Sequence, residues 1–208
     1  AWTWETQPQG GDVDFLRLCF SVYRALRRAG LSVDILPPDT SDLSGWKAVF
    51  APGLATMCDA LLDAFGAFGG TAVLGPRTNA KTVDMALPLP LPPTLPGLDA
   101  TVARVESLPP GSVVRVAGGG AFAHWFEQLD GDAKETWRTV DGGPAMMSAG
   151  KLHYLAGWPE DRLWDRLVVE VAETEGLGTE RLPEGLRLRD EGGHRFAFNY
   201  APEPVEWN

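Results

Sequence analysis

Helical and strand-like patterns alternate over the first third of the chain, and this alternation limits the possible folds more than any other feature. Apolar residues recur every three or four positions across residues 12–29, which predicts a helix, and residues 58–70 predict a second one. Short apolar stretches at 31–36 (LSVDIL), 46–53 (WKAVFAPG) and 71–75 (TAVLG) predict buried strands. Such alternation is typical of a parallel sheet covered by helices. We therefore predict an α/β fold of the open, doubly wound kind.

The second half of the chain has a different pattern. Between residues 101 and 156, apolar and polar residues alternate with a period of two and glycines separate the stretches, which predicts antiparallel or edge strands. Residues 160–176 predict a final amphipathic helix, with Glu160 expected to cap it because negative charge suits its first turn. Residues 182–207 predict a hairpin that turns at Glu191-Gly192-Gly193, which is too little structure to fold alone.

The two halves are joined by residues 86–97, ALPLPLPPTLPG, which contain five prolines. Proline has no backbone N–H and cannot donate to a hydrogen-bonded ladder. We expect this segment to form an extended surface arm or connector.

Charge limits the partners that the protein can have. Its formal charge is −10, which argues against a nucleic-acid partner, and the densest basic cluster, residues 24–28, is interpreted as a solvated helix face. No apolar run reaches the ~18 residues that span a bilayer, and no signal-peptide pattern is found. We expect a cytoplasmic protein that binds no membrane.

The cysteines and histidines do not form a metal-ligand or disulfide pattern. Cys19 and Cys58 fall within apolar helical patterns, where a buried free thiol is the usual state. The three histidines, His124, His153 and His194, lie far apart and lack a partner at ligand spacing. We therefore expect no metal and no cofactor.

In an open α/β fold, ligands bind beyond the carboxyl ends of the strands, which here are residues 51–56, 75–81 and 157–161. Class I glutamine amidotransferases place a nucleophilic cysteine on a sharp turn after one strand, an oxyanion loop after another, and a His-Pro-Glu segment after a third. In this chain APG at 51–53 matches the oxyanion loop, GPRTNA has the form of the turn, and GWPE replaces His-Pro-Glu. The scaffold resembles that superfamily.

The chemistry of that superfamily is missing. Arg77 stands where the nucleophile would be, and Trp158 stands where the base would be. A guanidinium cannot attack a carbonyl, and an indole has no nitrogen that accepts a proton in this role. We predict no catalytic residue and interpret Arg77, Trp158 and Glu160 as a degenerate amidotransferase site. A divergent enzyme that uses Thr78 or Glu160 is one alternative, and a sugar-binding module that uses some of the eight tryptophans is another.

Long motifs in a fixed order identify a family. They resemble the carboxyl-terminal half of bacterial β-galactosidases of glycoside hydrolase family 42 over essentially the whole chain. The segments that carry the resemblance are residues 2–54, GGTAVLGPRTNAKT, the Trp of HWFEQL, KLHYLAGWPEDRLW and LPEGLRLRDEGGHRFAFNY.

The resemblance implies a domain organisation and a function. Residues 1–180 would be the trimerisation domain, an amidotransferase-like (flavodoxin-like) three-layer sandwich, and residues 181–208 would begin a small carboxyl-terminal β domain. The parent enzyme would be a homotrimer that hydrolyses terminal β-D-galactose residues with two glutamates in a separate (β/α)8 barrel, so no catalytic residue is carried over and no activity is expected from this chain alone. The family has a further strand before the segment WTWETQPQG, so we expect a fragment whose first strand is missing.

Overall fold

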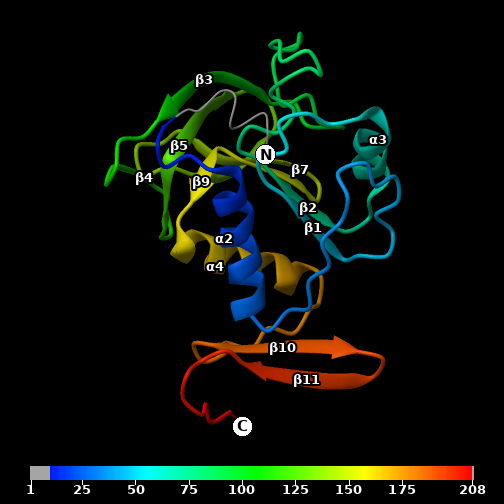
Figure 1. Ribbon diagram of the computed structural model, residues 1–208. Helices are drawn as coiled ribbons and strands as arrows, with labels where there is room; N and C mark the ends of the chain where they lie inside the picture. The colour runs from blue at the N-terminus through cyan, green and yellow to red at the C-terminus, as the bar shows by residue number, and fades with distance from the viewer. Residues whose placement is uncertain (1–9, 208) are drawn as a thin grey trace.

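The computed structural model describes residues 10–207, and a five-stranded mixed sheet lies at its centre (Figure 1). Its strand order is β1-β2-β8-β7-β6. The strands β1 (Ala48–Ala51), β2 (Thr71–Leu74) and β8 (Leu152–Leu155) are parallel, whereas β7 (Pro144–Ala149) and β6 (Lys134–Arg138) pair in antiparallel fashion. All four residues of β2 are buried, as expected for the middle of a covered parallel sheet. The predicted mixed α/β fold is confirmed.

A second, antiparallel sheet is built from the middle of the chain. Its order is β3 (Thr101–Ser107), β5 (Ala121–Asp130) and β4 (Val113–Arg115), and β9 (Gly157–Pro159) also pairs with β5. The period-two alternation of this region therefore predicted its strands correctly. Because β9 follows β8 after one residue, it links the two sheets.

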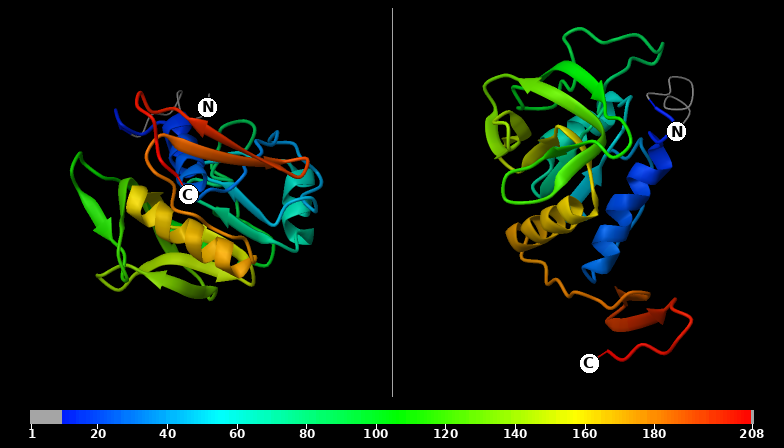
Figure 2. Two further views of the ribbon diagram at one scale, coloured as in Figure 1. Left: turned by 90° about the horizontal axis from the view of Figure 1, so that it is seen from below. Right: turned by 90° about the vertical axis from the view of Figure 1, so that its left-hand side faces the viewer.

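Two helices, α2 (Phe15–Arg28) and α4 (Asp161–Thr174), lie side by side, and α3 (Asp59–Ala67) lies apart from them near β1 and β2 (Figures 1 and 2). Asp14 caps α2, because its side chain accepts a hydrogen bond of 2.7 Å from the Arg17 backbone N–H. The buried face of α4 consists of apolar residues at helical spacing, namely Leu163, Trp164, Leu167, Val168, Val171 and Ala172.

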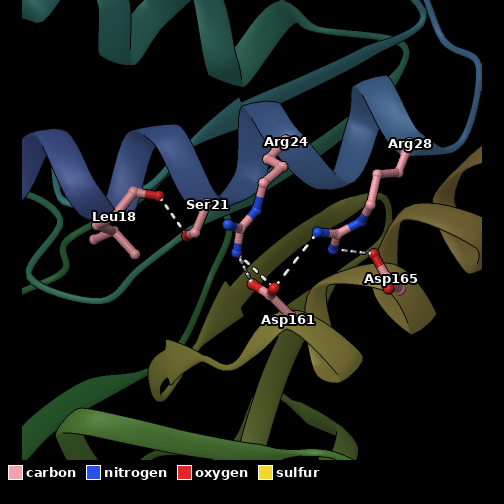
Figure 3. A network of polar contacts seen from close by, with 6 residues as sticks. All are labelled: Leu18, Ser21, Arg24, Arg28, Asp161 and Asp165. Carbon is pink, nitrogen blue, oxygen red and sulfur yellow. Dashed lines mark hydrogen bonds and ion pairs between the residues drawn. The ribbon is translucent and has the colours of Figure 1, made fainter. Parts of the chain in front are cut away.

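Ion pairs join α2 to α4 (Figure 3). Arg24 Nη2 lies 2.5 Å from Asp161 Oδ2, and Arg28 Nη2 lies 2.5 Å from Asp165 Oδ1. Arg27 is buried and donates to the Leu31 carbonyl at 2.8 Å. The prediction that this basic cluster is a solvated face is therefore wrong, because α4, far away in sequence, supplies its carboxylates.

The Asp161→Asn substitution is expected to lower the free energy of unfolding by about 1 kcal/mol or less, because Asp161 and its arginine partners are partly exposed. Thermal unfolding at low and high salt measures the loss, which should shrink at high salt. Asp59→Asn is the matched control, since Asp59 also lies in a first helical turn but forms no ion pair within residues 10–207. Equal losses in both variants would mean that the helix dipole, and not the arginines, is responsible.

The predicted strand at residues 31–36 is not formed. The segment has no ladder partner, and the side chain of Ile35 is 86% exposed. In the sheet order β1 is an edge strand, and no described strand, the segment 31–36 included, pairs with its outer edge. An apolar segment without a neighbouring strand cannot satisfy its backbone groups in a sheet.

The end of the described chain is a hairpin of β10 (Leu186–Glu191) and β11 (His194–Asn199), as predicted (Figure 1). Its turn residues, Gly192 and Gly193, both have positive φ, a conformation that glycine adopts without strain.

Within residues 10–207, no helix is long and apolar enough to cross a membrane.

The two cysteines differ from expectation. Cys58 is exposed at the N-cap position of α3 and is not a buried helix residue, so that prediction is wrong. Cys19 is half-buried, and burial raises the pKa of its thiol to about 11. Both are free thiols.

Candidate functional site

The chain turns sharply at the carboxyl end of β2, where an amidotransferase nucleophile is expected. Gly75 has φ +84° and Arg77 has φ +60°, a backbone conformation that is uncommon for a residue with a side chain. The Gly75 backbone N–H donates to Thr78 Oγ1 at 2.7 Å, and the Arg77 backbone N–H donates to Glu127 Oε1 at 2.9 Å. The turn thus has the strained form that functional sites often show, but it presents an arginine.

A buried carboxylate holds this turn in place. Glu127, on β5, also accepts hydrogen bonds from Trp125 Nε1 at 3.0 Å and from the Tyr154 hydroxyl at 2.7 Å. The Arg77 guanidinium lies 5.3 Å from the centre of the Trp125 ring. We call Arg77, Trp125, Glu127 and Tyr154 the Glu127 cluster. It ties the turn after β2 to β5 and β8, and sequence reasoning did not single out Glu127.

Burial dominates the electrostatics of the Glu127 cluster. Burial raises the pKa of Glu127, although its three hydrogen-bond donors and the Arg77 charge oppose the rise. Burial also raises the pKa of Tyr154 well above its usual range and lowers the pKa of Arg77. Arg77 is 4% exposed, so its side chain is packed within the fold and does not face an open substrate site.

Trp158 lies in a different environment. It is buried on β9, and its ring centre lies 4.9 Å from that of His124 on β5. His124 Nδ1 is 2.6 Å from Asp12 Oδ2, and this interaction lowers the pKa of Asp12. The β5–β9 register shifts after Ala123, where His124 has φ +64°, so a β-bulge aims the imidazole at Trp158 and Asp12.

Glu160 occupies the N-cap position of α4, as predicted, although its side chain forms no capping hydrogen bond. Together with Trp158 and His124 it lines a pocket of about 290 Å³. The hydroxyl in this pocket, that of Ser21, donates to the Leu18 carbonyl of its own helix at 2.7 Å (Figure 3). Among the described residues that line it, the pocket therefore has no hydrogen-bonded pair of nucleophile and base, which acyl transfer requires.

The structure divides the three candidate site residues between two places. Arg77 packs against Trp125 in the Glu127 cluster, whereas Trp158 and Glu160 line the pocket beside His124. Thr78, the alternative nucleophile, is fully buried, and its oxygen accepts from Gly75.

Comparison with known proteins identifies the family. The family model described as the beta-galactosidase trimerisation domain matches residues 1–178. The chain belongs to this family.

Relatives and solved structures agree with that assignment. A curated β-galactosidase from Thermus thermophilus is 42% identical over 212 residues, which cover 99% of this chain and 33% of the relative. The crystal structure of a β-galactosidase from the psychrophilic Marinomonas ef1 matches with a TM-score of 0.92 and 31% identity, over 100% of this chain and 32% of that one. A β-galactosidase from Halorubrum lacusprofundi matches with a TM-score of 0.82 and 34% identity, over 96% and 32% of the two chains. The chain thus spans about a third of the length of the relatives it matches, and the resemblance to family 42 is confirmed.

The tryptophans that the structure describes do not provide open stacking faces. Within residues 10–207, every tryptophan is buried or half-buried; these are Trp46, Trp125, Trp137, Trp158, Trp164 and Trp207. Trp2 and Trp4 lie outside the described residues. A sugar-binding module needs an exposed indole on which a sugar ring can stack, and the described part of the domain offers none.

The histidines of the chain have protein partners. His153 Nδ1 lies 2.7 Å from Ser148 Oγ, and burial lowers its pKa. His194 stacks edge-on against Phe196 in the hairpin. Within the described residues, no three histidine, cysteine, aspartate or glutamate side chains come together as metal ligands.

Proposed function

We propose that this chain is a non-catalytic assembly domain that brings three copies of a β-galactosidase together, and that the whole protein hydrolyses terminal β-D-galactose residues of β-galactosides with its catalytic barrel. The family match over residues 1–178 carries the proposal. The names of the curated relatives, which are β-galactosidases, support the activity assigned to the whole protein.

The geometry of the candidate site supports a role without catalysis. Arg77 is locked in the Glu127 cluster, and Trp158 is packed against His124 where a base would be needed. We interpret Arg77, Trp158 and Glu160 as the degenerate form of an amidotransferase site. A buried guanidinium and an indole contribute to folding here, because neither can act as nucleophile or general base.

We propose the corresponding fold in more detail as an open, doubly wound, amidotransferase-like sandwich. The parallel order of β1, β2 and β8 and the sharp turn after β2 support it. A further strand, from outside residues 10–207, would pair with the outer edge of β1. Half-burial of all four β1 residues and the exposed segment 31–36 support such a neighbour.

We place the boundary to a second, small β domain near residue 180. Leu182, Leu186 and Leu188 form a core of their own with Val205 and Trp207, separate from the main core. Residues 181–208 would thus begin this second domain.

The mass of the full-length protein in solution tests the assembly role. Light scattering at micromolar concentration should give the mass of three copies, since obligate interfaces bury on the order of 2,000 Å² or more and persist at that dilution. A mass equal to one copy would contradict the proposal.

The full-length protein should hydrolyse a β-galactoside, whereas the 208-residue chain alone should show neither this activity nor glutaminase turnover. Glutaminase turnover that Glu160→Ala abolishes would instead support a divergent enzyme.

A further inference from the structure

A proline-rich loop projects from the molecule beyond the two sheets (Figures 1 and 2). We call residues 82–97 the proline arm. Its outer part exposes large apolar side chains of a kind that folded proteins usually bury. Val83 is 84%, Leu87 57% and Leu89 85% exposed. Neither the core nor the candidate site uses these residues.

The proline arm is fixed at its base. Pro93 and Leu95 are buried, and the Pro92 carbonyl accepts a hydrogen bond of 2.8 Å from the Val102 backbone N–H. The side chain of Asn79 donates to the Pro93 carbonyl at 3.3 Å. The arm therefore leaves the body at a defined position.

The tip of the proline arm is also ordered. The Met85 backbone N–H donates to the Thr82 carbonyl, and the Thr82 N–H donates to the Ala86 carbonyl, each at 3.0 Å. The prolines restrict φ along the rest of the arm. An arm that is ordered before binding loses little conformational entropy when its side chains are buried, which favours a role as an anchor.

Charge indicates which partner the arm meets. The chain has a net charge of −10, so two copies repel each other at most surface contacts, whereas residues 85–98 contain no charged side chain. Asp84 is the one charged side chain of the arm, so the arm can approach an identical acidic molecule at little electrostatic cost. A strongly basic partner would instead be recognised through the acidic surface.

We propose that the proline arm docks against a second copy of this chain, with Val83, Leu87 and Leu89 as the anchor side chains that become buried. This inference rests on the proposed assembly function and assigns part of its interface. A few apolar anchors in a preorganised segment supply most of the affinity in many interfaces, and a projecting arm reaches a neighbouring copy that the compact body does not.

The test uses the full-length protein with Leu87→Glu and Leu89→Glu combined. Light scattering or sedimentation over a dilution series measures the dissociation constant of the assembly. This constant should rise by about 100-fold or more, because the loss of each anchor side chain raises it about tenfold. Leu89→Glu alone should raise it about tenfold. Far-UV circular dichroism should stay unchanged, since the substituted side chains are exposed.

Val140→Glu is the matched control, because Val140 is 63% exposed and lies outside the arm. It should leave the dissociation constant unchanged. A wild-type protein that assembles and an arm variant that assembles equally well would overturn the role of the arm and leave the assembly function intact. Equal weakening by Val140→Glu would also overturn it, whereas a monomeric wild type would refute the assembly function itself.

Discussion

Glu127→Ala is expected to lower the free energy of unfolding of this chain by about 3–5 kcal/mol, a large part of the stability of an ordinary domain. The substitution removes the carboxylate that accepts from three buried donors, namely the Arg77 backbone N–H, the Trp125 indole N–H and the Tyr154 hydroxyl. It also removes the negative charge that opposes the effect of burial on the pKa of the Arg77 guanidinium. Equilibrium urea unfolding measures the loss.

Two conservative variants separate hydrogen bonding from a simple loss of volume. Glu127→Leu fills the space and should lower the free energy of unfolding nearly as much as alanine does, because the same three donors lose the carboxylate. Glu127→Gln keeps an acceptor for Arg77 and Trp125 and should cost about 1 kcal/mol or less. If leucine restored most of the wild-type stability, the cluster would be a packing site and the hydrogen bonds would be unimportant.

The pH dependence of stability gives an independent check. Because burial raises the pKa of Glu127, the folded state binds its proton more tightly than the unfolded state does. The stability that this side chain contributes is fully present below the ordinary glutamate pKa and is lost as the pH rises through the raised value. The stability of wild type relative to Glu127→Gln should therefore fall as the pH rises above the ordinary glutamate pKa. A relative stability that rose with pH would contradict the raised pKa.

Local patterns in the sequence were enough to predict much of the fold. The helices α2 and α4 follow from apolar residues at helical spacing, and the long strand β5 follows from its alternation. Their buried faces are set by each element's own sequence. The sharp turn after β2, where Arg77 lies, is at the carboxyl end of a strand, where sites in α/β folds are generally found.

The features that were missed depend on contacts between distant residues. Residues 31–36 look like a buried strand, but a strand forms only beside a partner, and no described strand lies there. The arginines of α2 look solvated until α4 brings Asp161 and Asp165 to them. The sequence did contain a signal for Glu127, because it shares the inward alternation of Trp125 and Leu129 on β5, and a carboxylate at an inward position needs partners.

Gly75→Ala is expected to destabilise the chain by about 3 kcal/mol or more, because the substitution combines backbone strain with a steric clash. Gly75 has φ +84°, and a Cβ atom built on it would lie 2.3 Å from the Leu155 carbonyl oxygen. That oxygen belongs to β8, which pairs with β2, so relief of the clash requires the two central strands to separate. Urea unfolding measures the loss, and weaker near-ultraviolet circular dichroism of Trp125 and Tyr154 would report disorder in the adjoining Glu127 cluster.

Gly111→Ala separates strain from the clash. Gly111 has a nearly identical φ of +81°, but a Cβ atom there would meet no atom within 4 Å. Gly111→Ala should therefore lower the free energy of unfolding by only about 1 kcal/mol, through backbone strain alone. The difference between the two variants measures how closely the turn after β2 is packed against β8. A difference near zero would mean that β2 and β8 move apart freely, and the Glu127 cluster would then not hold the turn rigidly. A large difference would show that close packing of this turn against β8 is a requirement of the fold.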